Sequence, residues 1–370
     1  MSEGRAAGSS LSQAEAYARI RLLRSANVGP VSYRQLLARY GNAEAALEAL
    51  PELAARGLKK SYRVATRTRV SAEIEAARAT GARYLFHDSA DYPPLLAELE
   101  SAPPILTARG DPALAHRPAV AMVGARNASA AALKLARDLA HELAGEGYVV
   151  VSGLARGIDG ACHEGALPAT IGVIASGIDI AYPPQHAKLQ ERIACDGLLL
   201  AEQPPGTEPR GSHFPSRNRI IAGIAAGTLV VEAAPKSGSL ITARLAGEAG
   251  REVMAIPGSP LDARSHGCNQ LIREGAILVQ SAEDVIELLA GFDGMPRSQV
   301  REPEPDFASA PDDEVPATDL ADLLSTAPVA IDELIRQTGS SPGAVHMALL
   351  ELEIAGHLAR HAGAKVSLAG

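Results

Sequence analysis

The chain has 370 residues, of which 46% are hydrophobic and 21% charged, as in soluble globular proteins of two or three domains. It contains no apolar run of the roughly 18 residues that cross a membrane, which excludes an integral membrane protein, and its start, MSEGRAAGSS, lacks the apolar core of a signal peptide, which predicts a cytoplasmic protein. The three scattered cysteines exclude a disulfide framework, and the net charge of −8 argues at first against a nucleic-acid binder.

Residues 1–80 predict an N-terminal helical domain. Helical patterns in residues 12–56 are interrupted at Gly29-Pro30 and resume with the apolar face of Leu36 and Leu37. Two short helices around Val28-Gly29-Pro30 resemble a helix-hairpin-helix, whose turn presents backbone N–H groups to a phosphate. A small bundle used only for packing explains the pattern equally well.

Residues 81–290 predict an α/β core. Short apolar pieces at 84–86 and 105–106 lie among prolines, and seven β-rich runs then alternate with Ala- and Leu-rich helical stretches. This alternation is typical of βαβ units that form a doubly wound, Rossmann-like parallel sheet with helices on both faces. The runs are 119–123, 148–152, 170–175, 197–201, 228–232, 252–256 and 276–279.

Loops at the carboxyl ends of such strands carry the function of doubly wound sheets. After the first run, Gly124 and Arg126 precede a helix, where an arginine and free N–H groups bind a phosphate. After the second run, a glycine-rich turn with an arginine forms another anion-binding turn, and Asp159 in it caps the next helix or helps to hold the anion. This turn contributes Ser152, Gly153, Arg156, Gly157 and Asp159, and the third run adds Gly177.

The fourth and fifth runs lead into the most basic loops. Arg217, Asn218 and Arg219 are predicted in the first turn of a helix, where cations oppose the helix dipole, so a ligand is expected to require them. Phe214 and His213 offer stacking surfaces beside them. Lys236, Ser237, Gly238 and Ser239 form a further anion-binding turn.

No catalytic or metal-binding pattern accompanies these turns. The sequence has no Walker A motif and no nucleophile elbow with a plausible triad, and the spacing of Cys162-His163 and His266-Gly267-Cys268 fits no standard zinc site. We therefore expect a surface that follows phosphates, with no catalytic residues, no metal and no cofactor.

The C-terminal region separates into two parts. Residues 291–316 are rich in proline and acids and predict a flexible linker. Residues 317–370 predict the three helices and hairpin of a winged helix, but its recognition helix, SPGAVHMALLELEIAG, has no Lys or Arg, which favours a protein-contact or structural role over DNA reading. Residues 291–370 contain thirteen acidic and five basic residues, so their net charge of −8 equals that of the whole chain. This acidity predicts that the linker and the C-terminal region do not bind DNA.

Several stretches of the core resemble the motifs of the DprA/Smf family, the bacterial DNA-processing proteins A. They are VGAR at 123–126, SGLARGID at 152–159, FPSRNRIIAG at 214–223, SGSLITA at 237–243, GREVMAIPG at 250–258 and GCNQLIREGA at 267–276. The resemblance covers about residues 85–290. It departs at Pro184, where the family sometimes has a lysine.

The resemblance implies a homodimer that binds single-stranded DNA during natural transformation and loads RecA onto it. It also implies an extended Rossmann core between a helical domain and a winged helix, with Arg126 in the DNA-binding pocket. Two other functions stay open, a nucleotide hydrolase of the lysine-decarboxylase-like (LOG) type and a sensor of a free nucleotide. The hydrolase would need a Glu after its glycine-rich loop, where this chain has Leu240. Five candidate turns favour a polymer over a single nucleotide.

Overall fold

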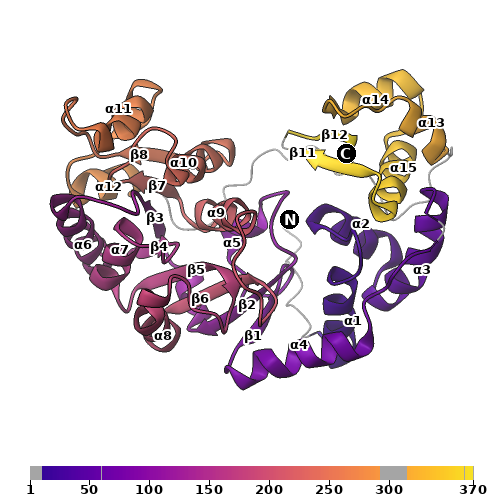
Figure 1. Ribbon diagram of the computed structural model, residues 1–370, viewed down its shortest axis with the longest axis horizontal. Helices are drawn as coiled ribbons and strands as arrows, with labels where there is room; N and C mark the ends of the chain where they lie inside the picture. The colour runs from indigo at the N-terminus through magenta and orange to yellow at the C-terminus, as the bar shows by residue number, and fades with distance from the viewer. Residues whose placement is uncertain (1–10, 60, 292–314, 362, 370) are drawn as a thin grey trace, which may run out of the picture. The chain divides into compact units, whose positions relative to one another are not determined.

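The computed structural model describes residues 11–59, 61–291, 315–361 and 363–369 (Figure 1). The described residues form two compact units: one is the core from residue 73 to 291, and the other combines residues 11–72 with the C-terminal region from 315 onward. Almost all of the predicted linker, residues 292–314, lies outside the described residues. In the described part of the chain, no helix is long and apolar enough to cross a membrane.

The described residues of the N-terminal region form four helices, α1 (Gln13–Leu23), α2 (Pro30–Tyr40), α3 (Ala43–Arg56) and α4 (Arg67–Ala79). Their starts follow local chemistry. Ser12 and Asn42 cap α1 and α3 by accepting backbone N–H groups of the first turn, and Pro30 occupies the first position of α2. The predicted break at Gly29-Pro30 is therefore the turn between α1 and α2.

A nine-stranded sheet forms the core, in the order β1-β2-β6-β5-β4-β3-β7-β8-β9. All seven predicted runs are strands and pair in parallel: β3 (Ala119–Val123), β4 (Val149–Ser152), β5 (Thr170–Gly177), β6 (Leu198–Gln203), β7 (Gly227–Val230), β8 (Glu252–Ala255) and β9 (Ile277–Leu278). The sequence missed that β1 (Arg83–Phe86) and β2 (Ile105–Gly110) extend the sheet beyond β6 as antiparallel strands. Strand order reverses around β3, since β4 and β7 flank it on opposite sides, and ligands of such sheets bind at this point.

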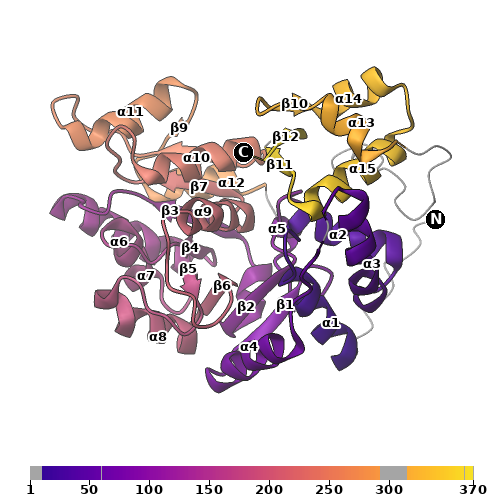
Figure 2. The same cartoon turned by 45° about the vertical axis from the view of Figure 1, so that its right-hand side comes forward.

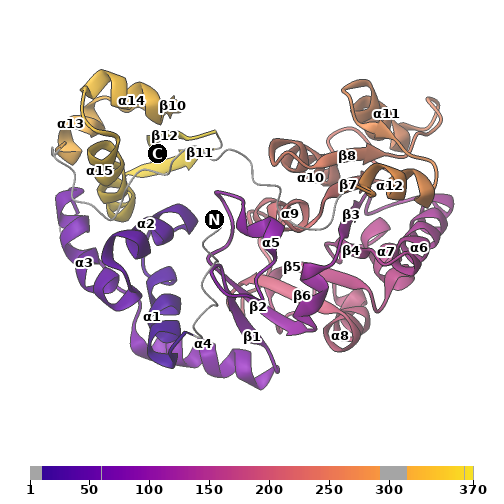
Figure 3. The same cartoon turned by 180° about the vertical axis from the view of Figure 1, so that it is seen from behind.

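Helices cover both faces of the sheet, as a doubly wound fold requires. One face packs against α6 (Ala130–Gly145), α7 (Ile158–Ala166), α8 (Ala187–Asp196) and α12 (Ala282–Leu289), which Figure 3 shows from behind. The other face packs against α5 (Pro94–Ala97), α9 (His213–Ile224), α10 (Gly238–Glu248) and α11 (His266–Arg273). Because both faces are covered, the central strands are buried along their whole length.

The C-terminal region is a winged helix, as predicted. It contains α13 (Ala317–Asp322), β10 (Val329–Ala330), α14 (Ile331–Thr338), α15 (Pro342–Ala355), β11 (Leu358–His361) and β12 (Lys365–Leu368). The three strands pair antiparallel in the order β10-β12-β11.

The winged helix packs on the N-terminal helices, so the regions that the sequence separates as residues 1–80 and 317–370 share one unit. Leu350 and Ile354 of α15 lie in the same apolar cluster as residues of α1, α2 and α3. Asn27 Nδ2 donates to the Ile354 carbonyl at 2.9 Å, and Lys59 Nζ donates to the Ala355 carbonyl at 3.1 Å. These contacts bury part of α15, which carries no Lys or Arg, against the N-terminal helices.

Candidate nucleic-acid interface

A cavity of about 580 Å³ opens at the carboxyl ends of β3, β4 and β7, where the strand order reverses. Helices α9 and α10, which lie side by side, form one wall (Figure 2). Most of the residues that the sequence singled out line this cavity or a smaller one of about 40 Å³ that adjoins it: Gly124, Arg126, Gly153, Arg156, Asp159, Phe214, Arg217, Asn218, Lys236, Ser237, Gly238 and Ser239.

Arg126 is one of the exposed cations of the site. It follows β3, and its guanidinium carbon lies 5.3 Å from the centre of the Phe214 ring. Phe214 in turn lies 5.7 Å from the ring of Tyr182, at an interplanar angle of 57°. Arg126 forms no ion pair with a carboxylate among the described residues, so its charge is available to an anion next to an aromatic surface.

Arg217 lies deeper in the same wall, with 6% of the residue exposed. Its Nη1 donates to the Val173 carbonyl at 3.1 Å, while its Nε has no hydrogen-bond partner. Burial lowers the pKa of Arg217, and the nearby charge of Asp159 opposes this change. The sequence placed Arg217 in the first helical turn, but α9 already begins at His213, which puts Arg217 in the second turn.

Asp159 holds the preceding loop instead of capping its own helix. Its Oδ2 accepts the backbone N–H groups of Gly153 at 3.2 Å and Ala155 at 3.3 Å. Burial raises the pKa of this carboxyl, and Arg217 and the two N–H groups counteract the rise. A Cβ on Gly153 would lie 1.5 Å from Arg217 Nη1, which explains why a glycine stands there.

The turn before α10 presents a helix N-terminus to the cavity. Ser237 is the N-cap, and its Oγ accepts from the Ser239 backbone N–H at 3.4 Å and lies 2.8 Å from Ser239 Oγ. Lys236, whose φ is 66°, is exposed beside it. Backbone donors, hydroxyls and a lysine thus meet at the positive end of a helix dipole, which suits an anion.

Four of the candidate residues do not line either cavity. Ser152 Oγ donates to the Met122 carbonyl at 2.6 Å in the buried sheet. Gly157 has a φ of 79° and packs against the Ala125 carbonyl, and Gly177 N donates to the Thr207 carbonyl. Arg219 turns the other way and binds Glu202 and the Ser101 carbonyl.

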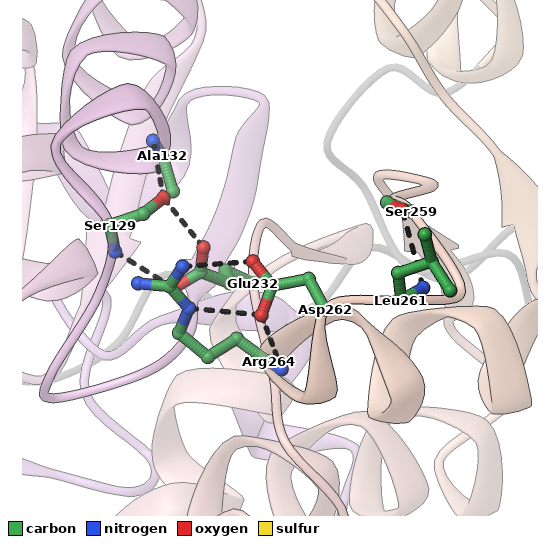
Figure 4. A network of polar contacts seen from close by, with 7 residues as sticks. All are labelled: Ser129, Ala132, Glu232, Ser259, Leu261, Asp262 and Arg264. Carbon is green, nitrogen blue, oxygen red and sulfur yellow. Dashed lines mark hydrogen bonds and ion pairs between the residues drawn. The ribbon is translucent and has the colours of Figure 1, made fainter.

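The sequence reasoning missed two residues that line the cavities, Tyr182 in the smaller one and Arg264 in the larger one. It also missed Glu232, which lines neither cavity. Glu232 accepts from Ser129 N at 3.0 Å and from Ser129 Oγ at 2.7 Å, at the start of α6 (Figure 4). Its position as the last residue of the fifth run was the one available signal. Arg264 comes from the loop between β8 and α11, which carries no glycine-rich anion turn, so no local pattern marked it.

Burial favours the uncharged forms of Cys162 and His163. Burial raises the pKa of the Cys162 thiol well above its usual value and lowers the pKa of His163 to about 3. His163 Nδ1 lies 2.7 Å from Thr170 Oγ1. Among the described residues, no group of three or more His, Cys, Asp and Glu side chains is placed to hold a metal ion.

Three family models match the chain. DNA recombination-mediator protein A matches residues 83–290, the DprA-like N-terminal HHH domain matches 13–76, and the DprA winged helix domain matches 302–364.

Relatives and solved structures agree with these models. Protein Smf of Synechocystis is 35% identical over 76% of this chain and 79% of its own, and DNA processing protein DprA of Streptococcus pneumoniae is 48% identical over 53% and 70%. The crystal structure of the Streptococcus pneumoniae DprA matches with a TM-score of 0.61 and 36% identity, over 75% of this chain and 98% of that one. A structure of DNA processing protein A from Helicobacter pylori, described for its single-stranded DNA binding mode, matches with a TM-score of 0.53 and 31% identity, over 57% and 96%.

Proposed function

Since the chain belongs to the DNA recombination-mediator protein A (DprA) family, we propose that it binds single-stranded DNA in the cavity of its core and loads RecA recombinase onto that strand during natural transformation, without catalysis. The same proposal includes a homodimer as the working form.

One observation carries the DNA-binding part of the proposal: several phosphate-binding groups and an aromatic pair line two adjoining cavities. Arg126, Lys236 and the N-terminus of α10 attract phosphates, and Phe214 with Tyr182 offers rings on which bases stack. Sequence-independent binding of single strands combines these two features, a cationic groove and aromatic platforms. A single nucleotide would need fewer phosphate contacts than the cavity offers.

The Helicobacter pylori DNA processing protein A, which is described for its single-stranded DNA binding mode, supports single-stranded DNA as the ligand. Loading of RecA rests on the family resemblance. The homodimer is supported by the edge of the sheet: β9 is the last strand of the sheet among the described residues, and its Ile277 and Leu278 are 38% and 46% exposed. An exposed apolar edge strand is a surface that a second copy would cover.

A salt titration of Arg126→Ala tests the site. Each phosphate contact on a single strand contributes about 0.7 to the slope of log K against log salt, so this variant should bind an oligo-dT more weakly and with a slope smaller by about 0.7. Arg244→Ala is the matched control, since Arg244 is an exposed arginine of α10 that pairs with Glu248 and does not line the cavity. Equal slopes for the wild type and Arg126→Ala would contradict the assignment.

Competition experiments distinguish binding of a DNA strand from the two alternatives, a nucleotide sensor and a nucleotide hydrolase. We expect unlabelled single strands to displace the labelled oligo-dT, with duplex and free nucleotides much weaker. A nucleotide sensor would instead show displacement by a mononucleotide at comparable concentration, and a hydrolase would release a base or phosphate from it.

A further inference from the structure

Arg264 is a cation of the cavity wall that lies outside every sequence motif of the site. It belongs to a short 3-10 turn, Ala263–Ser265, between β8 and α11. The residue lines the 580 Å³ cavity together with Arg126 and Lys236, and 47% of its side chain is exposed. The cavity therefore receives positive charge from three separate loops, after β3, after β7 and after β8.

Asp262 fixes the orientation of this arginine. One carboxylate oxygen, Oδ1, accepts from Arg264 N at 3.0 Å and from Arg264 Nε at 3.1 Å, and Oδ2 accepts from Nη2 at 2.8 Å. A guanidinium has five N–H donors in a rigid plane. The N–H groups on Nη1 have no hydrogen-bond partner among the described residues, so they remain for a further acceptor.

The neighbouring acid does not take up these donors. Figure 4 shows the Arg264 guanidinium beside Glu232, whose charge attracts it at a distance. Both carboxylate oxygens of Glu232 accept from Ser129 at the start of α6. The carboxylate of Glu232 therefore binds Ser129, and among the described residues the Arg264 guanidinium hydrogen-bonds to Asp262 alone, a partly exposed carboxylate two residues away. An ion pair of this type contributes little by itself.

From this geometry we infer that Arg264 contacts a phosphate of the bound single strand and that Asp262 is its positioning residue. The inference rests on the proposed function, because it adds a contact to the same DNA site. It extends the path of the strand along the cavity from Arg126 and the α10 turn to the loop before α11. A planar guanidinium already oriented by a carboxylate loses less side-chain freedom when it binds a phosphate.

Binding of an oligo-dT to the full-length chain across a salt titration tests the inference. We expect Arg264→Ala to weaken binding at low salt about fivefold or more and to lower the salt slope by about 0.7, the contribution of one phosphate. Leu261→Ala is the control on the same loop, since Leu261 is 95% exposed and does not line the cavity. It should bind as the wild type does.

Two further variants distinguish the phosphate contact of Arg264 from the positioning role of Asp262. Arg264→Lys keeps the charge but not the planar fork, so its affinity should fall between those of the wild type and Arg264→Ala while its salt slope stays at the wild-type value. Asp262→Ala should weaken binding, and it should cause no further loss in the presence of Arg264→Ala. Tighter binding by Asp262→Ala would show that the carboxylate only competes with phosphate and would overturn its positioning role.

The outcomes separate this inference from the proposed function. If Arg126→Ala weakens binding while Arg264→Ala and Leu261→Ala both match the wild type, the DNA site stands and the role of Arg264 is refuted. If neither arginine variant changes affinity or slope, the proposed DNA site itself fails. Thermal unfolding of Arg264→Ala should match that of the wild type, because the pair it removes is exposed. If Arg264→Ala unfolds at a lower temperature than the wild type, Arg264→Lys provides the test instead. Wild-type affinity in Arg264→Lys would refute a contact that needs an oriented guanidinium.

Discussion

Replacing Arg217 by methionine tests how the floor of the cavity is held together. The side chain of Arg217 is buried, and its charge faces that of Asp159, which is equally buried at 6% exposure. Methionine replaces the unbranched aliphatic stem of arginine but carries neither the guanidinium nor its charge. The variant therefore leaves the Asp159 carboxylate with the N–H groups of Gly153 and Ala155 but without its nearest cation.

The size of the effect follows from these contacts. Two unit charges 4 Å apart attract by about 4 kcal/mol at an effective dielectric constant of about 20, and Arg217 and Asp159 form no direct ion pair, so their attraction is smaller. The hydrogen bond to the Val173 carbonyl adds about 1 kcal/mol. We expect Arg217→Met to lower the unfolding free energy of the core by about 2–4 kcal/mol at pH 7, somewhat less than the roughly 3–5 kcal/mol for breaking a direct buried ion pair.

Urea unfolding followed by circular dichroism measures this loss. Burial raises the folded-state pKa of Asp159 above its unfolded value, so the folded state binds more protons and gains stability as the pH falls. Removing Arg217 raises that pKa further, and the deficit of Arg217→Met should therefore shrink between pH 7 and pH 5. The double variant Arg217→Met/Asp159→Asn should recover most of the lost free energy. A deficit that is the same at both pH values and persists in the double variant would refute the reasoning.

Three other predictions concern parts outside the DNA site. Burial lowers the pKa of His163 to about 3, so the unfolding free energy of the core should fall as the pH drops below 6.5, by up to about 1.4 kcal/mol per pH unit. The fall should be less steep in His163→Asn, and identical pH profiles of the two proteins would contradict this prediction. A Cβ at position 57 would lie 2.1 Å from the Glu351 carbonyl although its φ of −76° suits alanine, so Gly57→Ala should cost about 1–3 kcal/mol and reduce hydrogen-exchange protection of α15. Gly145→Ala, with open space around it, is the control, and unchanged protection of α15 in both would refute the contact. Deleting residues 300–370 should leave the affinity for single strands within about twofold, since the cavity lies in the core, and a tenfold loss would contradict it.

The sequence by itself determined the elements and the edge of the sheet where the site lies. Runs of β-branched and aliphatic residues marked the seven parallel strands, and local caps such as Ser129 and Ser237 set where helices begin. Because parallel strands all end at one edge, the turns after them were bound to meet there. These features depend only on neighbours in the chain, which is why a pattern of residues reveals them.

Only the tertiary structure decided which side chains face the cavity. Arg217 and Arg219 are two residues apart, which on a helix of 3.6 residues per turn directs them to nearly opposite sides. The first therefore joins Asp159 at the cavity, and the second binds Glu202. Arg264 enters from a loop without a motif, and α15 packs on the N-terminal helices from more than 300 residues away in the chain. Such encounters depend on how distant segments pack, and no local pattern encodes them.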